Sequence, residues 1–137
     1  MREVLAGWIA GNVLGIHATI ALAYMARPGG TLQAIRERLL PGINPVLFAV
    51  PLFVGASVGG TMLGLILGSV YRVGGFAERG DGLASPSITF TLMVCLLAIA
   101  PLPALLILAH REWIVWTVSA AAFAALFGWL MPNLAGG

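Results

Sequence analysis

The stretch from Val54 to Tyr71, VGASVGGTMLGLILGSVY, decides the fold that this sequence predicts. It is apolar and uncharged, and it belongs to a longer run that reaches the roughly 20 helical residues needed to cross a bilayer core of about 30 Å. At 100° per residue, Gly60, Gly64 and Gly68 fall within about 80° of one another. Such a stripe lets a second helix approach closely, so we expect this helix to be the packing centre of a membrane protein.

Composition independently favours a membrane protein. Of 137 residues, 60% are hydrophobic and only 9% are charged, and the mean hydropathy is +1.00. A soluble domain carries about 25% charged residues, so this chain could not cover a water-facing surface. The net charge of +2 comes from seven arginines and five acidic residues. This excess of positive charge is too small for nucleic-acid binding, which needs clustered cations.

Four apolar segments are long enough to span the membrane. Caps and breakers frame them: Asn44 precedes Pro45 at one helix start, Ser85 precedes Pro86 at another, and Arg27-Pro28-Gly29-Gly30 ends the first. The sequence therefore predicts one membrane domain over residues 1–137, an all-α bundle of four transmembrane helices, with spans at about 4–26, 45–71, 86–110 and 113–131. We also expect prolines to break two of these helices, at Pro51 in the second span and at Pro101 and Pro103 in the third.

Four spans place both termini on the same side of the membrane. The terminal side carries three arginines and the opposite side four, of which three lie in the short first loop. By the positive-inside rule this favours termini on the non-cytoplasmic side.

Two loops carry most of the remaining polarity. In the first, TLQAIRERLL (Thr31 to Leu40) has its apolar residues on one face, which predicts a short amphipathic helix at the membrane interface. Its Arg36 and Arg38 could face a partner or anionic lipid. The second loop, residues 72–85, is rich in glycine, and its candidate partner-facing residues are Glu78, Arg79 and Asp81.

The small residues predict how the helices pack. The first span has glycines four apart that match the stripe of the second span. The expected helix-packing residues are Gly7, Gly11, Gly15, Ser57, Gly60, Thr61, Gly64 and Gly68. Gly55 and Gly59 lie roughly opposite that stripe. The second span should therefore present two packing faces, one for the first span and one for another helix, a second copy or a foreign subunit.

His17 lies deep within a predicted span, where an ionisable residue is a functional candidate. Haem or pigment ligation is the sharper hypothesis, with His110 as the obvious second ligand. His17 lies about nine residues from the helix end, or roughly 13 Å, whereas His110 lies at that boundary. Two axial ligands need nearly one depth, so we expect His17 to hydrogen-bond a backbone carbonyl or a neighbouring subunit. No cofactor and no metal site are predicted, although bound lipids are expected.

The function predicted from these features is that of a non-catalytic structural or accessory subunit. All five acidic residues, Glu3, Glu37, Glu78, Asp81 and Glu112, lie in loops or near the terminus, which disfavours proton-coupled transport. No catalytic pattern is present, so we do not expect an enzyme. The expected partners are the bilayer and other integral membrane subunits or a second copy. The alternative is a small homo-oligomeric channel or carrier lined by Asn12, His17, Ser57 and Thr61.

Overall fold

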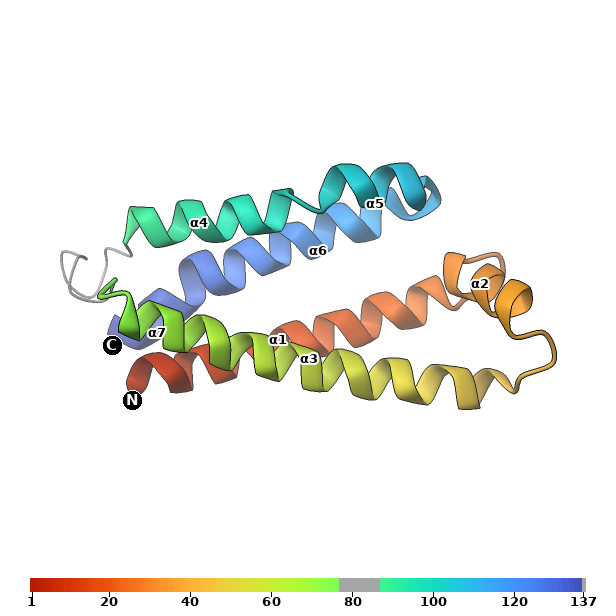
Figure 1. Ribbon diagram of the computed structural model, residues 1–137, viewed down its shortest axis with the longest axis horizontal. Coiled ribbons are helices and arrows are strands. Elements are labelled where there is room, and N and C mark those ends of the chain that lie inside the picture. Colours follow the sequence, from red (N-terminus) through yellow and green to blue (C-terminus); the bar gives the residue numbers. More distant parts are fainter. Residues whose placement is uncertain (77–86, 137) are drawn as a thin grey trace.

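The computed structural model, which describes residues 1–76 and 87–136, confirms the all-α four-helix membrane bundle. Its helices run antiparallel, with both termini at the same end in Figure 1. The elements in chain order are α1 (Arg2–Met25), α2 (Thr31–Leu39), α3 (Pro45–Val73), α4 (Ile88–Ile99), α5 (Leu102–Leu108), η1 (His110–Glu112), α6 (Trp113–Ala125), η2 (Leu126–Leu130) and α7 (Met131–Gly136). Four stretches are long and apolar enough to span a membrane: Arg2–Met25, Pro45–Val73, Ile88–Leu108 and His110–Gly136.

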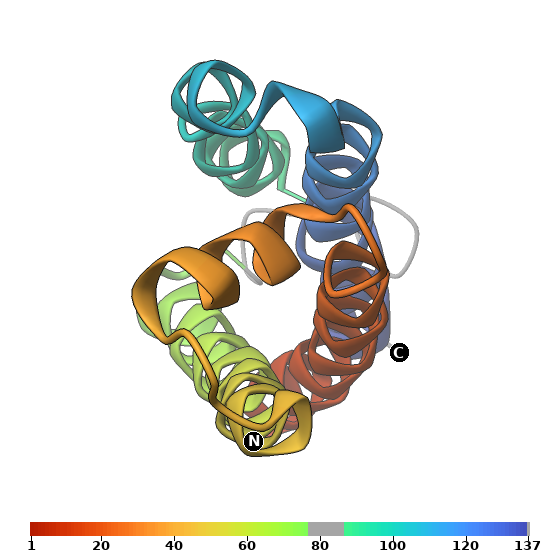
Figure 2. The ribbon, with the colours of Figure 1, turned by 90° about the vertical axis from the view of Figure 1, so that its right-hand side faces the viewer.

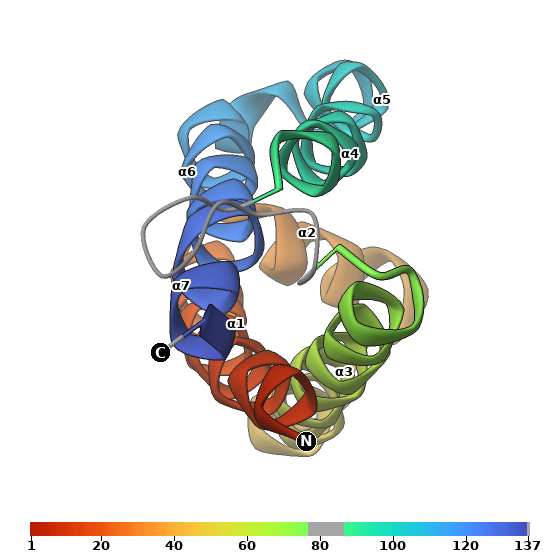
Figure 3. The same cartoon turned by 90° about the vertical axis from the view of Figure 1, so that its left-hand side faces the viewer.

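The four spans form an arc in which each packs mainly on its neighbour. Along the arc the order is α3, α1, the α6–η2–α7 span and the α4–α5 span (Figures 2 and 3). The two outer spans approach at the terminal end, where the Tyr71 and Phe90 rings make an edge contact with centroids 4.8 Å apart. The buried core lies at this end and contains Phe90, Val94, Phe127 and Met131. One long face of α3 is consequently left outside the bundle.

The start of α3 and the turn that follows α1 are determined by local sequence. Asn44 caps α3 because its side-chain Oδ1 accepts a hydrogen bond from the Val46 N–H at 2.9 Å, and Pro45 occupies the first helical position. The turn after α1 passes through Gly29, whose φ of +78° favours glycine. The turn leads into α2, which lies across the end of the bundle opposite the termini, the end that faces the viewer in Figure 2.

Proline breaks one of the two predicted helices and leaves the other intact. The third span divides into α4 and α5 at Ala100–Pro101. In contrast, α3 continues through Pro51, so the prediction of a break there was wrong. Pro51 is exposed and its missing N–H removes one helix hydrogen bond, to the Leu47 carbonyl, without ending the helix.

The fourth span extends beyond the predicted end at Met131, because Pro132 lies within α7. A π-helical segment, η2, precedes it. Pro132 has no N–H to give to the Gly128 carbonyl four residues earlier. That carbonyl instead accepts a hydrogen bond from the Thr91 hydroxyl of α4 at 3.0 Å. A side chain of the neighbouring helix thus satisfies the group that the proline leaves free.

Candidate functional site

The closest helix contact in the structure joins α1 to α3 through their glycines. A Cβ built on Gly64 would lie 2.7 Å from the Gly11 Cα, and one on Gly60 would lie 2.7 Å from the Gly15 Cα. Gly7 meets the backbone of Gly64 and Gly68 in the same way. Real Cβ atoms do not approach backbone this closely, so only glycine permits this separation. The structure therefore places the predicted packing glycines of the two spans against one another.

The opposite side of α3 carries Gly55 and Gly59, the glycines of the second packing face that the sequence predicts. A Cβ built on Gly55 or Gly59 would have no neighbour within 4 Å. Val58 and Met62 beside them are more than half exposed. Within the apolar 18-residue stretch that identifies each span, α3 has the smallest share of buried residues. This open face, formed by Gly55, Val58, Gly59 and Met62, is called the α3 outer face below.

Polar residues beside the glycine contact bond within the α1–α3 pair. The Thr61 hydroxyl lies 3.3 Å from the Asn12 Oδ1 and 3.1 Å from the Ser57 carbonyl oxygen. The Asn12 amide donates to the Trp8 carbonyl in its own helix. Three of the four residues considered as a solute-path lining therefore gather at one edge of this pair.

The fourth, His17, lies on the other side of α1, against α6. Its Nε2 is 3.0 Å from the Ser119 hydroxyl. The partner is thus a side chain of another span rather than the backbone carbonyl or second subunit expected from sequence. His110 lies in η1, at the end of the bundle. The signal for this pairing in the sequence is a serine, Ser119, inside an apolar segment, and it was not among the predicted site residues.

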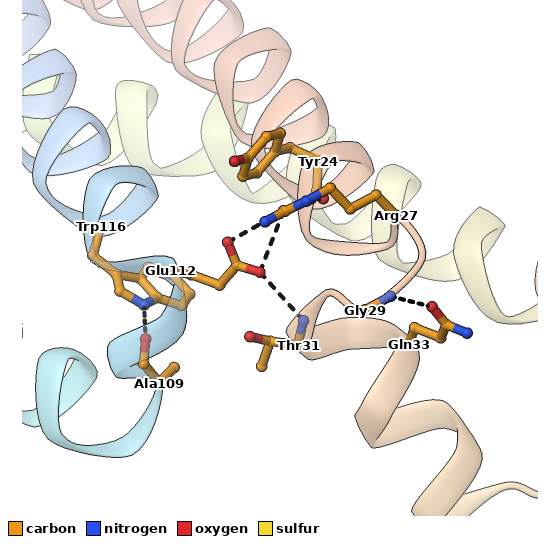
Figure 4. Close-up of polar contacts among 8 residues, drawn as sticks. All are labelled: Tyr24, Arg27, Gly29, Thr31, Gln33, Ala109, Glu112 and Trp116. Carbon is orange, nitrogen blue, oxygen red and sulfur yellow. Dashed lines mark hydrogen bonds and ion pairs between the residues drawn. The ribbon is translucent and has the colours of Figure 1, made fainter.

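A buried carboxylate joins the first and last spans at the end opposite the termini (Figure 4). The Glu112 side chain is 1% exposed and lies 3.3 Å from the Arg27 guanidinium. Its Oε1 also accepts from the Thr31 N–H at 3.3 Å, at the start of α2. The Arg27 guanidinium lies over the Tyr24 ring, 3.7 Å from its centroid. From its sequence context Glu112 was expected to be an ordinary loop residue, whereas in the structure it links two spans and α2.

The predicted partner-facing charges of α2 remain at its surface. Arg38 is exposed, and Arg36 forms a loose ion pair with Glu37 at 3.9 Å. Glu78, Arg79 and Asp81 lie outside the described residues. Across residues 1–76 and 87–136 there is no group of three or more His, Cys, Asp or Glu side chains placed to hold a metal ion.

Two apolar grooves flank the contact between His17 and Ser119. The larger, of about 340 Å³, lies between α1, the α4–α5 break and α6, and the smaller, of about 300 Å³, runs between α1 and α6 toward Tyr24. His17 lines both. No protein-family model, no curated protein and no solved structure matches this chain.

Proposed function

We propose that this chain is a non-catalytic structural or accessory subunit of a larger membrane assembly and that another subunit packs on the α3 outer face. The observation that carries the proposal is the contrast between the two sides of α3. One side holds glycines pressed against the α1 backbone, and the other holds Gly55 and Gly59 facing open space.

Helix energetics support a partner at this face. Glycine inside a helix costs about 1 kcal/mol relative to alanine, so two open glycines destabilise α3 when nothing packs on them. Within a bilayer, apolar burial gives little drive for helix association, and close van der Waals packing at small residues is what favours it. A helix from another subunit that packs at Gly55 and Gly59 would offset their cost.

The polar side chains of the spans support the same proposal. The Thr91 hydroxyl bonds the Gly128 carbonyl, and His17 bonds Ser119. Both hydrogen bonds join spans of this chain to each other. Such groups stabilise the packing of α4 on η2 and of α1 on α6, as expected of a structural subunit.

Isolation from native membranes tests the proposal. A tagged chain is extracted in mild detergent, and its companions are identified by mass spectrometry. We expect one or more larger integral membrane proteins with the native chain, and we expect Gly59→Leu to lose them while remaining folded and monodisperse. Ala121→Leu, at an exposed position on α6, is the matched control and should keep them. A native chain that is recovered alone, as a monomer or homo-oligomer, would contradict the proposal.

The channel alternative has less support. It requires Asn12, His17, Ser57 and Thr61 to share a lining, but His17 lies toward α6 while the other three lie at the α1–α3 edge. A path through one chain therefore does not connect them. Solute flux through liposomes that contain the purified chain, changed by His17→Ala, would revive this alternative.

A further inference from the structure

The larger groove beside His17 has the size and lining of a ligand site. Its volume of about 340 Å³ lies within the roughly 300–1,000 Å³ range of small-molecule pockets. Apolar side chains from three spans form most of its wall, and the small side chains of its alanines leave the groove open. Its lining includes Leu14, Ala98, Leu105, Trp116, Ala120 and Phe123.

Hydrogen-bonding groups also lie along this apolar wall. His17 and Ser119 both line the groove and bond to each other. The second ring nitrogen of His17, Nδ1, has no hydrogen-bond partner among the described residues. No buried side-chain nitrogen or oxygen in those residues lacks a partner, so the unbonded Nδ1 is not fully buried, and His17 lines both grooves.

The helix break supplies a second polar group. Proline has no N–H, so the Leu97 carbonyl, four residues before Pro101, receives no α-helical hydrogen bond from it. Leu97 and Pro101 both line the groove. A helical break at membrane depth is tolerated where it lines a cavity or is buried in protein.

The depth of His17 in the membrane limits which molecules can form hydrogen bonds with these groups. His17 lies eight residues before the end of α1 at Met25, or about 12 Å along the axis at 1.5 Å per residue. The ester and headgroup atoms of a phospholipid lie near the membrane surface, and its acyl tail has no hydrogen-bonding group at this depth. A suitable occupant needs an apolar body and a carbonyl or hydroxyl group that enters the hydrocarbon core.

We propose that this groove binds a quinone-type molecule, an apolar ring with carbonyl or hydroxyl groups on an isoprenoid tail, whose ring oxygen hydrogen-bonds His17. The ring would lie against Trp116 and Phe123 and the tail would extend along the open side of the groove into lipid. Either imidazole tautomer suits this class, since Nδ1 can donate to a carbonyl or accept from a hydroxyl.

Titration of the full chain with decylubiquinone in phosphatidylcholine nanodiscs tests this assignment. Trp8, Trp113 and Trp129, which are all exposed, are replaced by phenylalanine so that quenching reports on Trp116. Unchanged helical content and thermal unfolding establish that this background retains the native fold. Because the isolated chain is used, failure here leaves the accessory-subunit proposal untouched.

Four variants separate the possible occupants. We expect saturable quenching before these substitutions are made. His17→Leu should lower the affinity for decylubiquinone about tenfold, which corresponds to the loss of a hydrogen bond worth about 1.4 kcal/mol. His17→Gln should recover much of the affinity, because an amide can also bond a ring oxygen. Ala120→Leu fills the groove and should abolish saturable binding, whereas Ala121→Leu, at the exposed adjacent position, should leave it unchanged.

Three results would overturn the proposal. Trp116 quenching that does not saturate would show that the groove is not the binding site. Equal quenching with and without Ala120→Leu in the same tryptophan-replaced background would show the same. Native affinity in His17→Leu together with loss in Ala120→Leu would show an occupant held by apolar contact alone, such as an acyl chain. If His17→Leu fails to fold, the comparison of His17→Gln, Ala120→Leu and Ala121→Leu still decides between these outcomes.

Discussion

Replacing Gly64 with alanine tests the contact between α1 and α3 with a single methyl group. The new Cβ would lie 2.7 Å from the Gly11 Cα and 2.9 Å from the Gly11 N, both backbone atoms. Carbon atoms pack at about 3.5–4.0 Å, so the two helices must separate by about 1 Å. A gap of that size forfeits a quarter to a half of each van der Waals contact along the seam.

The expected loss is about 1–3 kcal/mol of the free energy of unfolding, as for other overpacked interiors. Alanine's better helix propensity offsets part of it, by up to about 1 kcal/mol. Gly59→Ala is the matched control, because it makes the same chemical change in the same helix where a Cβ meets nothing within 4 Å. It should leave stability unchanged or raise it by up to about 1 kcal/mol.

Unfolding in mixed micelles titrated with sodium dodecyl sulfate, followed by circular dichroism, measures both variants. The double variant Gly7→Ala/Gly64→Ala adds a test of the shared seam. Because Gly64→Ala already separates the helices, the second substitution should cost less than it does alone. Equal stability of Gly64→Ala and Gly59→Ala, or strict additivity in the double variant, would refute the proposed seam.

The same titration checks three smaller predictions. Glu112→Gln should cost about 1–2 kcal/mol because it removes the charge that Arg27 pairs with, and 0.5 M salt should not reproduce the loss since the carboxylate is 1% exposed. Thr91→Val should cost about 1 kcal/mol, because the Gly128 carbonyl loses its donor. Asn44→Ala should cost about 1 kcal/mol and speed amide exchange in the first turn of α3.

The predictions for Glu112 and Thr91 each have a more exposed counterpart. Arg36→Gln breaks an ion pair at 3.9 Å to an exposed glutamate and should change stability by less than about 0.5 kcal/mol. Ser69→Ala removes a hydroxyl that donates to the Leu65 carbonyl in its own helix, and it should be near neutral. A surface variant as costly as its buried counterpart would contradict the assigned role of the buried group.

The spans could be predicted because length and hydropathy suffice for them. Crossing a bilayer requires a fixed length of apolar helix, and the four segments meet that requirement. Glycines four apart in α1 and α3 also indicated which faces could come close. The α2 helix was predictable for a different reason, since its residues separate into an apolar and a charged face.

The partners of each face could not be read from the sequence. Lipid and protein interior are equally apolar, so the spans carry no amphipathic pattern that says which neighbour a face meets. The pairing of His17 with Ser119 and the burial of Glu112 therefore required the three-dimensional structure. The continuation through Pro132 was equally hidden, because the Thr91 hydroxyl that satisfies the freed carbonyl lies 37 residues away in sequence.

Photo-crosslinking at position 59 tests the central claim, a foreign subunit on the α3 outer face, most directly. Benzoylphenylalanine replaces Gly59 in one tagged chain and Ile114, an exposed residue of α6, in another. After irradiation of native membranes, we predict that position 59 yields one discrete adduct with a different, larger membrane protein, and that position 114 yields none. An adduct of this chain with itself, or only lipid adducts at position 59, would contradict the account.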